Sequence, residues 1–309
     1  MISEVLLVGA GAIGVYFSGR LAQAGAKVTA AARSDYDAVS KNGYRVTSIA
    51  GDFDWRPEVV RDAAHYGRKA DLIVIALKAL PEVDVVELVR PAVGKNTAFL
   101  LIQNGLDVEL PLHEAFPDNE LYSAIAFIGV SRLAPGVVVH KGGGELTVGL
   151  YGSSEIPEKL RGLAAMFAAA GVKCGLTDDT ERMRWGKLLW NVPFNPLSVL
   201  AGGMTTAEMM ADKHVEILAF KLMKEVQLTA RACGVELPEA QLEHNMEYTR
   251  NFPPYKTSML LDFENRRPLE VEAILGSVVR RARMHNVDTP CIDSCYVLLG
   301  ARDRMNRKK

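Results

Sequence analysis

A glycine-rich turn near the N-terminus constrains the fold of this chain more than any other feature of its sequence. The motif GAGAIG at 9–14 follows the apolar run 5–8 and opens a stretch of helical character. In a strand–turn–helix unit, the first glycine makes the tight turn, the second lets a pyrophosphate approach the backbone, and the third lets the helix pack on the strand. A purely structural glycine turn is the alternative. The candidate dinucleotide-binding residues are Gly9, Gly11, Ala12, Ile13 and Gly14.

The end of the second apolar run indicates which dinucleotide binds. An NAD site usually has an Asp or Glu there, which binds the ribose 2′-hydroxyl. The run 27–31 is followed instead by Ala32 and Arg33. A guanidinium can bind a 2′-phosphate through paired charge-assisted hydrogen bonds, whereas a carboxylate would repel it. We therefore expect NADPH/NADP as the cofactor and Arg33 as a binding residue, with an ordinary surface arginine as the alternative.

Apolar runs alternate with helical stretches through the first half of the chain. Such near-continuous runs are typical of parallel strands that are covered on both faces. Strands are expected at 5–8, 27–31, 71–77, 97–103 and 121–128, and helices at 13–24, 81–89, 108–116 and 158–170. The Gly- and Val-rich segment 137–151 is expected to form a β-hairpin at an edge. The pattern predicts an α/β fold with an N-terminal Rossmann-type doubly wound domain.

Beyond residue 178 the pattern becomes almost entirely helical. Val215, Leu218, Leu222, Val226, Thr229 and Cys233 form one apolar stripe, which ends at Gly234. Thr289 and Pro290 open a last helix, with the threonine as its cap. We therefore expect an NADP-binding Rossmann domain at 1–177 and an all-helical substrate and catalytic domain at 178–309.

Composition excludes several classes of protein. The 309 residues contain 36 Lys+Arg and 37 Asp+Glu, so no broad basic field for nucleic acid is present. The apolar N-terminal stretch is too short to cross a membrane and lacks the positive start of a signal peptide, which indicates a cytoplasmic protein. The six histidines are scattered and the four cysteines have no matching cluster, so no metal site is expected. The basic residues at 302–309 are expected to form a solvated tail.

Other polar residues could carry chemistry, although each also has a plain structural explanation. Lys78 and Asn104 follow strands at the edge where ligands bind in such sheets, or they are loop residues. Lys187, Asn191 and Asn195 share one helix face among apolar neighbours, as in a pocket wall, or the lysine reaches water and the amides cap helix turns. Pro193 and Pro196 predict a kink there. Glu270 could pair with Arg266 or Arg267.

Taken together, these segments resemble the ketopantoate reductase (2-dehydropantoate 2-reductase) family over essentially the whole chain. The resemblance is carried by LLVGAGAIG, Arg33, LKA around Lys78, QNG at 103–105 and His140 with its glycine run. The segments KLLWNVPFNPLSVL from Lys187 and SMLLDFENRRPLEVEAILG from Ser258 are the most specific. Pro193 departs from the family, which more usually has a small aliphatic residue there.

The resemblance implies a role for each matching position. The glycines, Arg33 and Lys78 would bind NADPH, Lys187 would be the general acid, and Glu270 would orient the hydroxyl end of the substrate. Asn104, Asn191, Asn195 and Ser258 would bind the substrate or order the site, and Asn104 would also contact the cofactor. A lysine suits this chemistry because hydride transfer to a 2-oxo acid puts negative charge on the carbonyl oxygen. The family has its active site in a cleft between two domains.

Three functions fit the sequence. The first is NADPH-dependent reduction of 2-dehydropantoate to (R)-pantoate, on the route to pantothenate and coenzyme A. The second is the same reaction on another branched 2-oxo acid, with Met259, Trp190 and Phe194 as the positions to compare. The third is a non-catalytic NADP(H)-binding regulator, which would have no need of an acid. A homodimer is possible, because the long apolar helices of the second domain could pair.

Overall fold

Contacts divide the chain into two compact units in this computed structural model, which describes residues 2–308. The first unit contains the chain up to Lys78 together with Val83–Gln103 and Glu109–Thr180. The second contains Ala79–Glu82, Asn104–Val108 and the chain from Glu181 on. Two short segments of the N-terminal half thus belong to the second unit. The domain boundary expected at residues 177 and 178 stays a prediction.

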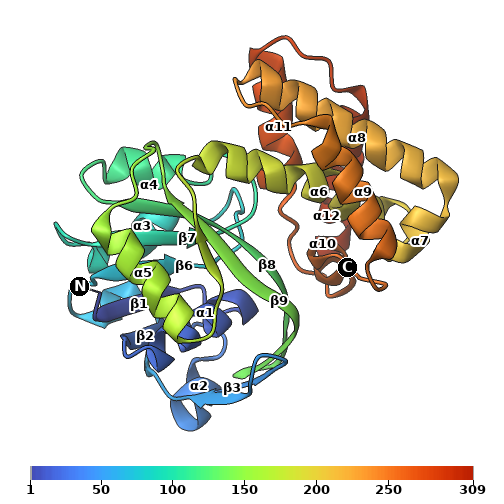
Figure 1. Cartoon of the computed structure of the whole chain (residues 1–309). Helices are drawn as coiled ribbons and strands as arrows, with labels where there is room; N and C mark the ends of the chain where they lie inside the picture. The colour runs from blue at the N-terminus through green and yellow to red at the C-terminus, as the bar shows by residue number, and fades with distance from the viewer. Residues whose placement is uncertain (1, 309) are drawn as a thin grey trace. The chain divides into compact units, whose positions relative to one another are not determined.

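One mixed sheet of ten strands organises the first unit, and its order is β4-β3-β9-β8-β7-β6-β1-β2-β5, with β10 paired to β9 (Figure 1). The strands are β1 (Glu4–Val8), β2 (Lys27–Ala31), β3 (Tyr44–Ser48), β4 (Phe53–Trp55), β5 (Glu58–Val60), β6 (Leu72–Ile75), β7 (Ala98–Ile102), β8 (Leu121–Ala134), β9 (Val137–Leu150) and β10 (Cys174–Leu176). The six strands from β5 through β2, β1, β6 and β7 to β8 are all parallel. This is the strand order of a doubly wound dinucleotide-binding sheet, so the expected fold is confirmed.

Both faces of the central strands are buried, which explains their continuous apolar character. Val5 and Leu7 of β1 belong to a core formed with α1 (Ala12–Gln23) and α5 (Glu158–Ala169). Leu6 between them is also fully buried. The remaining helices of this unit are short: α2 (Tyr36–Asn42), α3 (Val85–Val89) and α4 (Leu110–Ala115). The helix expected at 81–89 begins later, because Asp84 caps it by accepting a hydrogen bond from Glu87 N.

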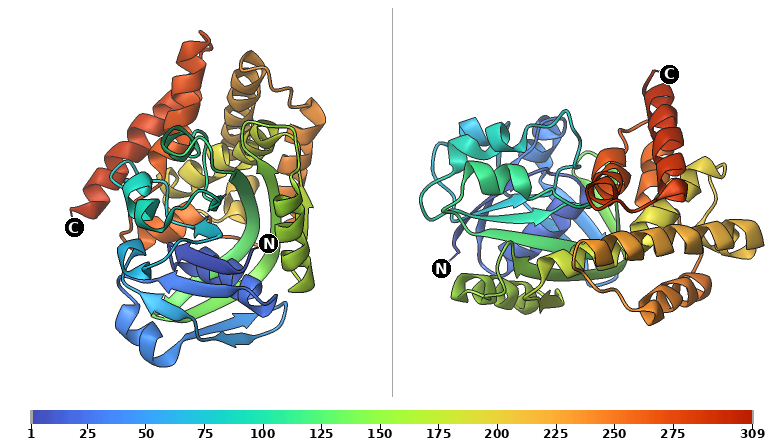
Figure 2. Two further views of the ribbon diagram at one scale, coloured as in Figure 1. Left: turned by 90° about the vertical axis from the view of Figure 1, so that its left-hand side faces the viewer. Right: turned by 90° about the horizontal axis from the view of Figure 1, so that it is seen from above.

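The hairpin expected within 137–151 is wrong. Val137–Leu150 is a single strand that pairs antiparallel with β8, and Figure 2 shows the pair as long green strands. It is not an edge, because β3 pairs with its start and β10 with its second half. The glycine run that suggested a turn lies within β9, where the pairing with β8 is irregular. Gly143 and Gly144 there have φ of 65° and 111°.

His140 on β9 joins this strand to β3 through a buried polar contact. Its ring is 1% exposed and lies 4.5 Å from the ring of Tyr16. Nε2 lies 3.1 Å from the carbonyl oxygen of Gly142, which can only accept, so Nε2 carries the proton. Nδ1 then accepts from Ser48 Oγ at 2.9 Å. This geometry stabilises the neutral ring, and burial lowers the pKa of His140 below its usual value.

The lowered pKa of His140 predicts a pH-dependent stability. Below about pH 6.5 the unfolded histidine takes up a proton while the folded one stays neutral, so the free energy of unfolding falls as pH falls, by up to about 1.4 kcal/mol per pH unit. We expect His140→Gln to remove this slope, as measured by urea denaturation between pH 5 and 8. His65→Gln is the control, because His65 is exposed. An unchanged slope in His140→Gln would contradict the assignment.

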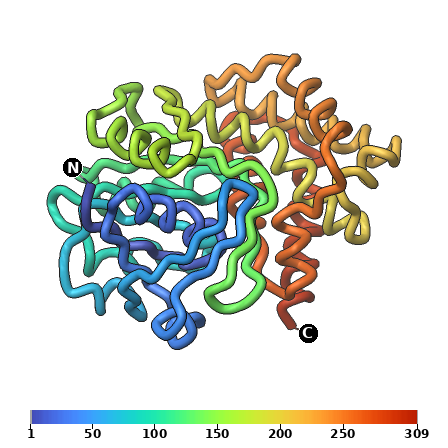
Figure 3. Tube along the Cα trace, turned by 60° about the horizontal axis from the view of Figure 1, so that its bottom comes forward, coloured from blue at the N-terminus to red at the C-terminus, as the bar shows by residue number. Residues whose placement is uncertain are grey.

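The second unit is built from helices, and Figure 3 traces them from yellow to red. They are α6 (Thr180–Leu200), α7 (Thr206–Ala211), α8 (Lys213–Ala232), α9 (Glu239–Asn251), α10 (Ser258–Glu264), a π-helical turn (Glu272–Gly276), α11 (Ser277–Met284) and α12 (Pro290–Arg307). Trp185, Phe194 and Leu222 are fully buried in their shared core. The helix α6 is continuous over Pro193 and Pro196, and the expected kink stays a prediction. No helix of residues 2–308 combines the length and apolar character that crossing a membrane requires.

One expectation for the last helix needs correction. Pro290 is its first residue as expected, but the side chain of Thr289 makes no capping hydrogen bond and binds Asp293. The cap is the buried carboxylate of Glu225 from α8, which accepts from Cys291 N and Ile292 N. The described basic residues at 302–308 are exposed, as expected of a solvated segment, although those up to Arg307 continue α12; Lys309 lies outside the described residues.

Candidate functional site

The glycine turn after β1 is crowded at two of its glycines and open at the third. A Cβ atom at Gly9 would lie 2.6 Å from Leu77 N, and one at Gly14 would lie 2.3 Å from the carbonyl oxygen of Gly9. Both positions therefore tolerate only glycine. A Cβ atom at Gly11 would meet no atom within 4 Å, so the turn is open there. No side chain caps the start of α1, which leaves the N–H groups of its first turn, including those of Ala12 and Ile13, for an anion.

The other expected cofactor residues of the first unit follow parallel strands at the same edge of the sheet as this turn. Arg33 is exposed two residues after the end of β2. Lys78 follows β6 and is half-buried, and the preceding residue, Leu77, is the one that crowds Gly9. Parallel strands present their carboxyl ends together, so these residues lie at the same edge of the sheet as the expected phosphate position.

The helix α6 carries three of the expected site residues on one face, in the second unit. Lys187, Asn191 and Asn195 are spaced four residues apart along it. Asn191 and Asn195 are 5% and 1% exposed, and Oδ1 of Asn195 has no hydrogen-bond partner among the described residues. A buried acceptor without a hydrogen-bond partner destabilises the folded state unless a ligand or water donates to it. Both amides are therefore buried in this unit, and their contact with a ligand stays a prediction.

Glu270 connects two segments that lie far from it in sequence. Its Oε1 accepts from Ala79 N at 3.1 Å, across 191 residues, and its Oε2 accepts from Asn104 Nδ2 at 3.3 Å, across 166 residues. Arg267, one of the partners considered for Glu270, binds Asp262 at 2.8 Å. The carboxylate thus lies beside Asn104, which was expected to contact both cofactor and substrate.

Lys187 lies close to both Glu270 and a second cation. Burial and the charge of Arg184 lower the pKa of Lys187 to about 8, while the charge of Glu270 acts in the opposite direction. Arg184 is 4% exposed, precedes Lys187 by one helical turn, and donates to the carbonyl oxygen of Gly105 at 3.5 Å. Sequence reasoning missed Arg184, although its i, i+3 spacing from Lys187 was a usable signal.

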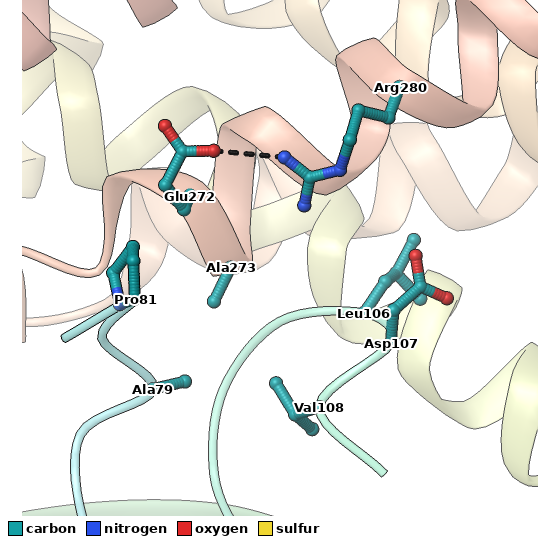
Figure 4. A pocket seen from close by; sticks show the side chains of 8 residues that line it. All are labelled: Ala79, Pro81, Leu106, Asp107, Val108, Glu272, Ala273 and Arg280. Atoms are coloured by element: carbon teal, nitrogen blue, oxygen red, sulfur yellow. Dashed lines mark hydrogen bonds and ion pairs between the residues drawn. The ribbon is translucent and has the colours of Figure 1, made fainter. Parts of the chain in front are cut away.

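A pocket of about 500 Å³ lies within the second unit (Figure 4). It is lined by Ala79, whose N–H binds Glu270, by Leu106 and Val108, and by Glu272, which pairs with Arg280 at 2.9 Å. The segment carrying Leu106 is held in place because Leu106 N donates to the carbonyl oxygen of Ala273. Ala79 thus both lines this pocket and binds the carboxylate that was expected to bind substrate.

Ser258, the remaining expected site residue, lies on α10. It is exposed at the first position of α10, and its place in the site stays a prediction. The residue before it, Thr257, is buried, bonds to Ser198 of α6 at 2.7 Å, and caps α10 at Leu260 N. Sequence reasoning missed this link between α10 and the helix that carries Lys187.

Comparison with known proteins assigns the family. The model for "Ketopantoate reductase PanE/ApbA" matches residues 5–153, and the model for its C-terminal part matches residues 179–303. The chain belongs to the ketopantoate reductase family. The resemblance carried by Lys187, Ser258 and the glycine turn is thereby confirmed, and so is the α/β fold followed by helices.

Individual members of this family match almost end to end. The 2-dehydropantoate 2-reductase of Nostoc sp. is 34% identical over 97% of this chain and 95% of its own. The crystal structure of the enzyme from Methylococcus capsulatus is 40% identical with a TM-score of 0.92, covering 99% of this chain and 98% of its own. That from Geobacter metallireducens is 33% identical with a TM-score of 0.91, covering 96% and 99%.

Proposed function

We propose that this protein reduces 2-dehydropantoate to (R)-pantoate with NADPH. The observation that carries the proposal is the grouping of Lys187, Glu270 and Asn104 in a chain of the ketopantoate reductase family. The curated relative from Nostoc sp. bears the name of this activity. A lysine beside a carboxylate and an amide supplies an acid and two polar groups for a small hydroxylated 2-oxo acid.

NADPH would be held by residues of the first unit. The N–H groups of Ala12 and Ile13 would bind the pyrophosphate over the open position at Gly11, Lys78 would add a positive charge, and Arg33 would bind the 2′-phosphate. When bound, NADPH supplies the hydride that reduces the substrate carbonyl. The glycine geometry supports this assignment. Neighbouring atoms crowd the turn at Gly9 and Gly14, and it is open at Gly11, where a phosphate must approach.

Lys187 would act as the general acid. As the carbonyl carbon accepts the hydride, charge develops on the carbonyl oxygen, and the ammonium group stabilises it and donates a proton to complete the alcohol. A pKa of about 8 suits this role, because the group is mostly protonated at neutral pH yet gives up its proton more readily than an ordinary lysine. Glu270 helps to keep it protonated.

Substrate would be oriented by the polar groups around Lys187. Glu270, held by Ala79 N and Asn104, would accept a hydrogen bond from the substrate hydroxyl. Asn191, Asn195 and Ser258 would bind the carboxylate or order the site, and the buried Oδ1 of Asn195 would accept a hydrogen bond from a substrate hydroxyl. These assignments depend on amide and hydroxyl groups, which can bind a small carboxylate without a dedicated arginine.

The test is NADPH oxidation, followed by absorbance, with 2-dehydropantoate and a panel of other 2-oxo acids. We expect kcat/KM for 2-dehydropantoate to exceed that of every other acid by about tenfold or more, since a polar site rejects analogues that leave its groups unpaired. Faster turnover of another branched 2-oxo acid would identify that acid as the substrate. The pocket positions to compare first would then be Met259, Trp190 and Phe194. NADPH binding without turnover of any acid would indicate a non-catalytic NADP(H)-binding regulator.

A cytoplasmic location and a homodimer stay predictions.

A further inference from the structure

Two arginines follow the carboxyl ends of the neighbouring strands β2 and β5. The strands are parallel, Ala31 is in register with Val60, and Ala32 N donates to the carbonyl oxygen of Val60 at 2.9 Å. Arg33 follows β2 and Arg61 follows β5 directly. Both therefore lie at the edge of the sheet that carries the glycine turn, where dinucleotides bind.

Arg61 is also held against the turn that carries Arg33. Its guanidinium carbon lies 4.2 Å from the centre of the Tyr36 ring, a cation–π contact that orients the side chain. Tyr36 N in turn donates to the carbonyl oxygen of Arg33 at 3.4 Å. Asp37 approaches Arg61 to 3.7 Å, but both side chains are more than half exposed, so that ion pair is weak. The guanidinium therefore remains accessible to an anion.

The buried carboxylate of this turn is already neutralised. Asp35, two residues after Arg33, is 4% exposed. Nη1 of Arg132, from β8, lies 2.8 and 2.9 Å from its two oxygens, and Ser34 Oγ donates to it at 2.8 Å. Without Arg132, an uncompensated negative charge would stand next to the expected 2′-phosphate position. The three arginines thus make the turn suitable for an anionic ligand group.

We propose that Arg61 is a second specificity determinant for the 2′-phosphorylated dinucleotide, binding the 2′-phosphate together with Arg33 while Arg132 neutralises Asp35. The inference rests on the proposed use of NADPH. A 2′-phosphate carries up to two negative charges and three acceptor oxygens, so two guanidinium groups from neighbouring strands match it better than one. Tyr36 and Asp35 are positioning residues in this arrangement.

The test measures nucleotide binding directly, by fluorescence titration with NADPH and NADH in the absence of substrate. Because one charge-assisted contact is lost, we expect Arg61→Met to raise the Kd of NADPH about tenfold and that of NADH less than about twofold. Arg45→Met is the matched control, since Arg45 is an exposed arginine of the same unit paired with Asp54. It should change neither Kd. An equal loss for NADPH and NADH, or no loss for either, would overturn the assignment to the 2′-phosphate.

A second pair of variants tests the neutralisation of Asp35. Arg132→Met should weaken NADPH binding about tenfold, by leaving the carboxylate uncompensated, and Asp35→Asn in the same chain should restore it. Failure of the double variant to recover, with an unchanged melting temperature, would contradict this part of the proposal.

The outcomes also separate this inference from the proposed cofactor. If the unmodified protein binds NADPH no better than NADH, the proposed use of NADPH is wrong. If it prefers NADPH and loses that preference in Arg33→Met but not in Arg61→Met, the cofactor stands and only the role of Arg61 is wrong.

Discussion

Replacing Lys187 with methionine should lower kcat about 10²- to 10⁴-fold, the usual contribution of a general acid. Methionine keeps the length of the side chain and removes both the charge and the proton. The Kd for NADPH should stay unchanged, because Lys187 is not among the residues expected to bind it. Stopped-flow and steady-state measurements of NADPH oxidation, with fluorescence titration for binding, check both statements. Lys213→Met, an exposed lysine of the second unit, is the control and should retain full activity.

The pH dependence adds a readout that a structural role for Lys187 would not produce. The acid must be protonated to react, so kcat/KM should be level below about pH 8 and fall tenfold per pH unit above it. The residual activity of Lys187→Met should lack this fall. A rate that rises with pH in the unmodified enzyme, or full activity in Lys187→Met, would show that another group donates the proton.

Replacing Glu270 with alanine should lower kcat/KM for 2-dehydropantoate by about 10²-fold or more, through the loss of hydrogen bonds to a charged group. Ala79 N and Asn104 Nδ2 would lose their acceptor, and the substrate would lose a partner. Glu270→Gln, which keeps the shape and one acceptor oxygen, should lose less. Most of the effect should appear in KM, measured by steady-state kinetics at saturating NADPH.

The Glu270 variants should also move the pH profile. The carboxylate raises the pKa of Lys187, so its removal should shift the fall in kcat/KM to lower pH. Glu272→Gln is the matched control, because Glu272 stands two residues along and binds Arg280 and Tyr296 instead. A loss of equal size in Glu272→Gln would mean that the Glu270 effect reflects general disturbance of the π-helical turn.

Local patterns were enough to predict the framework of this protein. The glycine turn, the apolar runs of β1, β2, β6 and β7 and the helical stripe of α8 each occupy one short window of sequence. Burial on both faces of a strand or on one face of a helix requires those periodicities. The hairpin expected at 137–151 failed because a glycine run is compatible with either a turn or a bulged strand. Only pairing with β3, β8 and β10 decides between them.

The candidate site depended on contacts that no window of sequence contains. Lys187 could equally have been a surface residue and Glu270 a partner of Arg266, until the fold brought Glu270 to Asn104 and Ala79 and close to Lys187. Arg184, Arg61 and the pairing of Asp35 with Arg132 escaped notice for the same reason. Periodicity reports which side of an element is buried, whereas the pKa and partners of a polar group depend on which distant segments pack against it. The sequence was therefore sufficient for the fold, and the tertiary structure was needed for the electrostatics of the site.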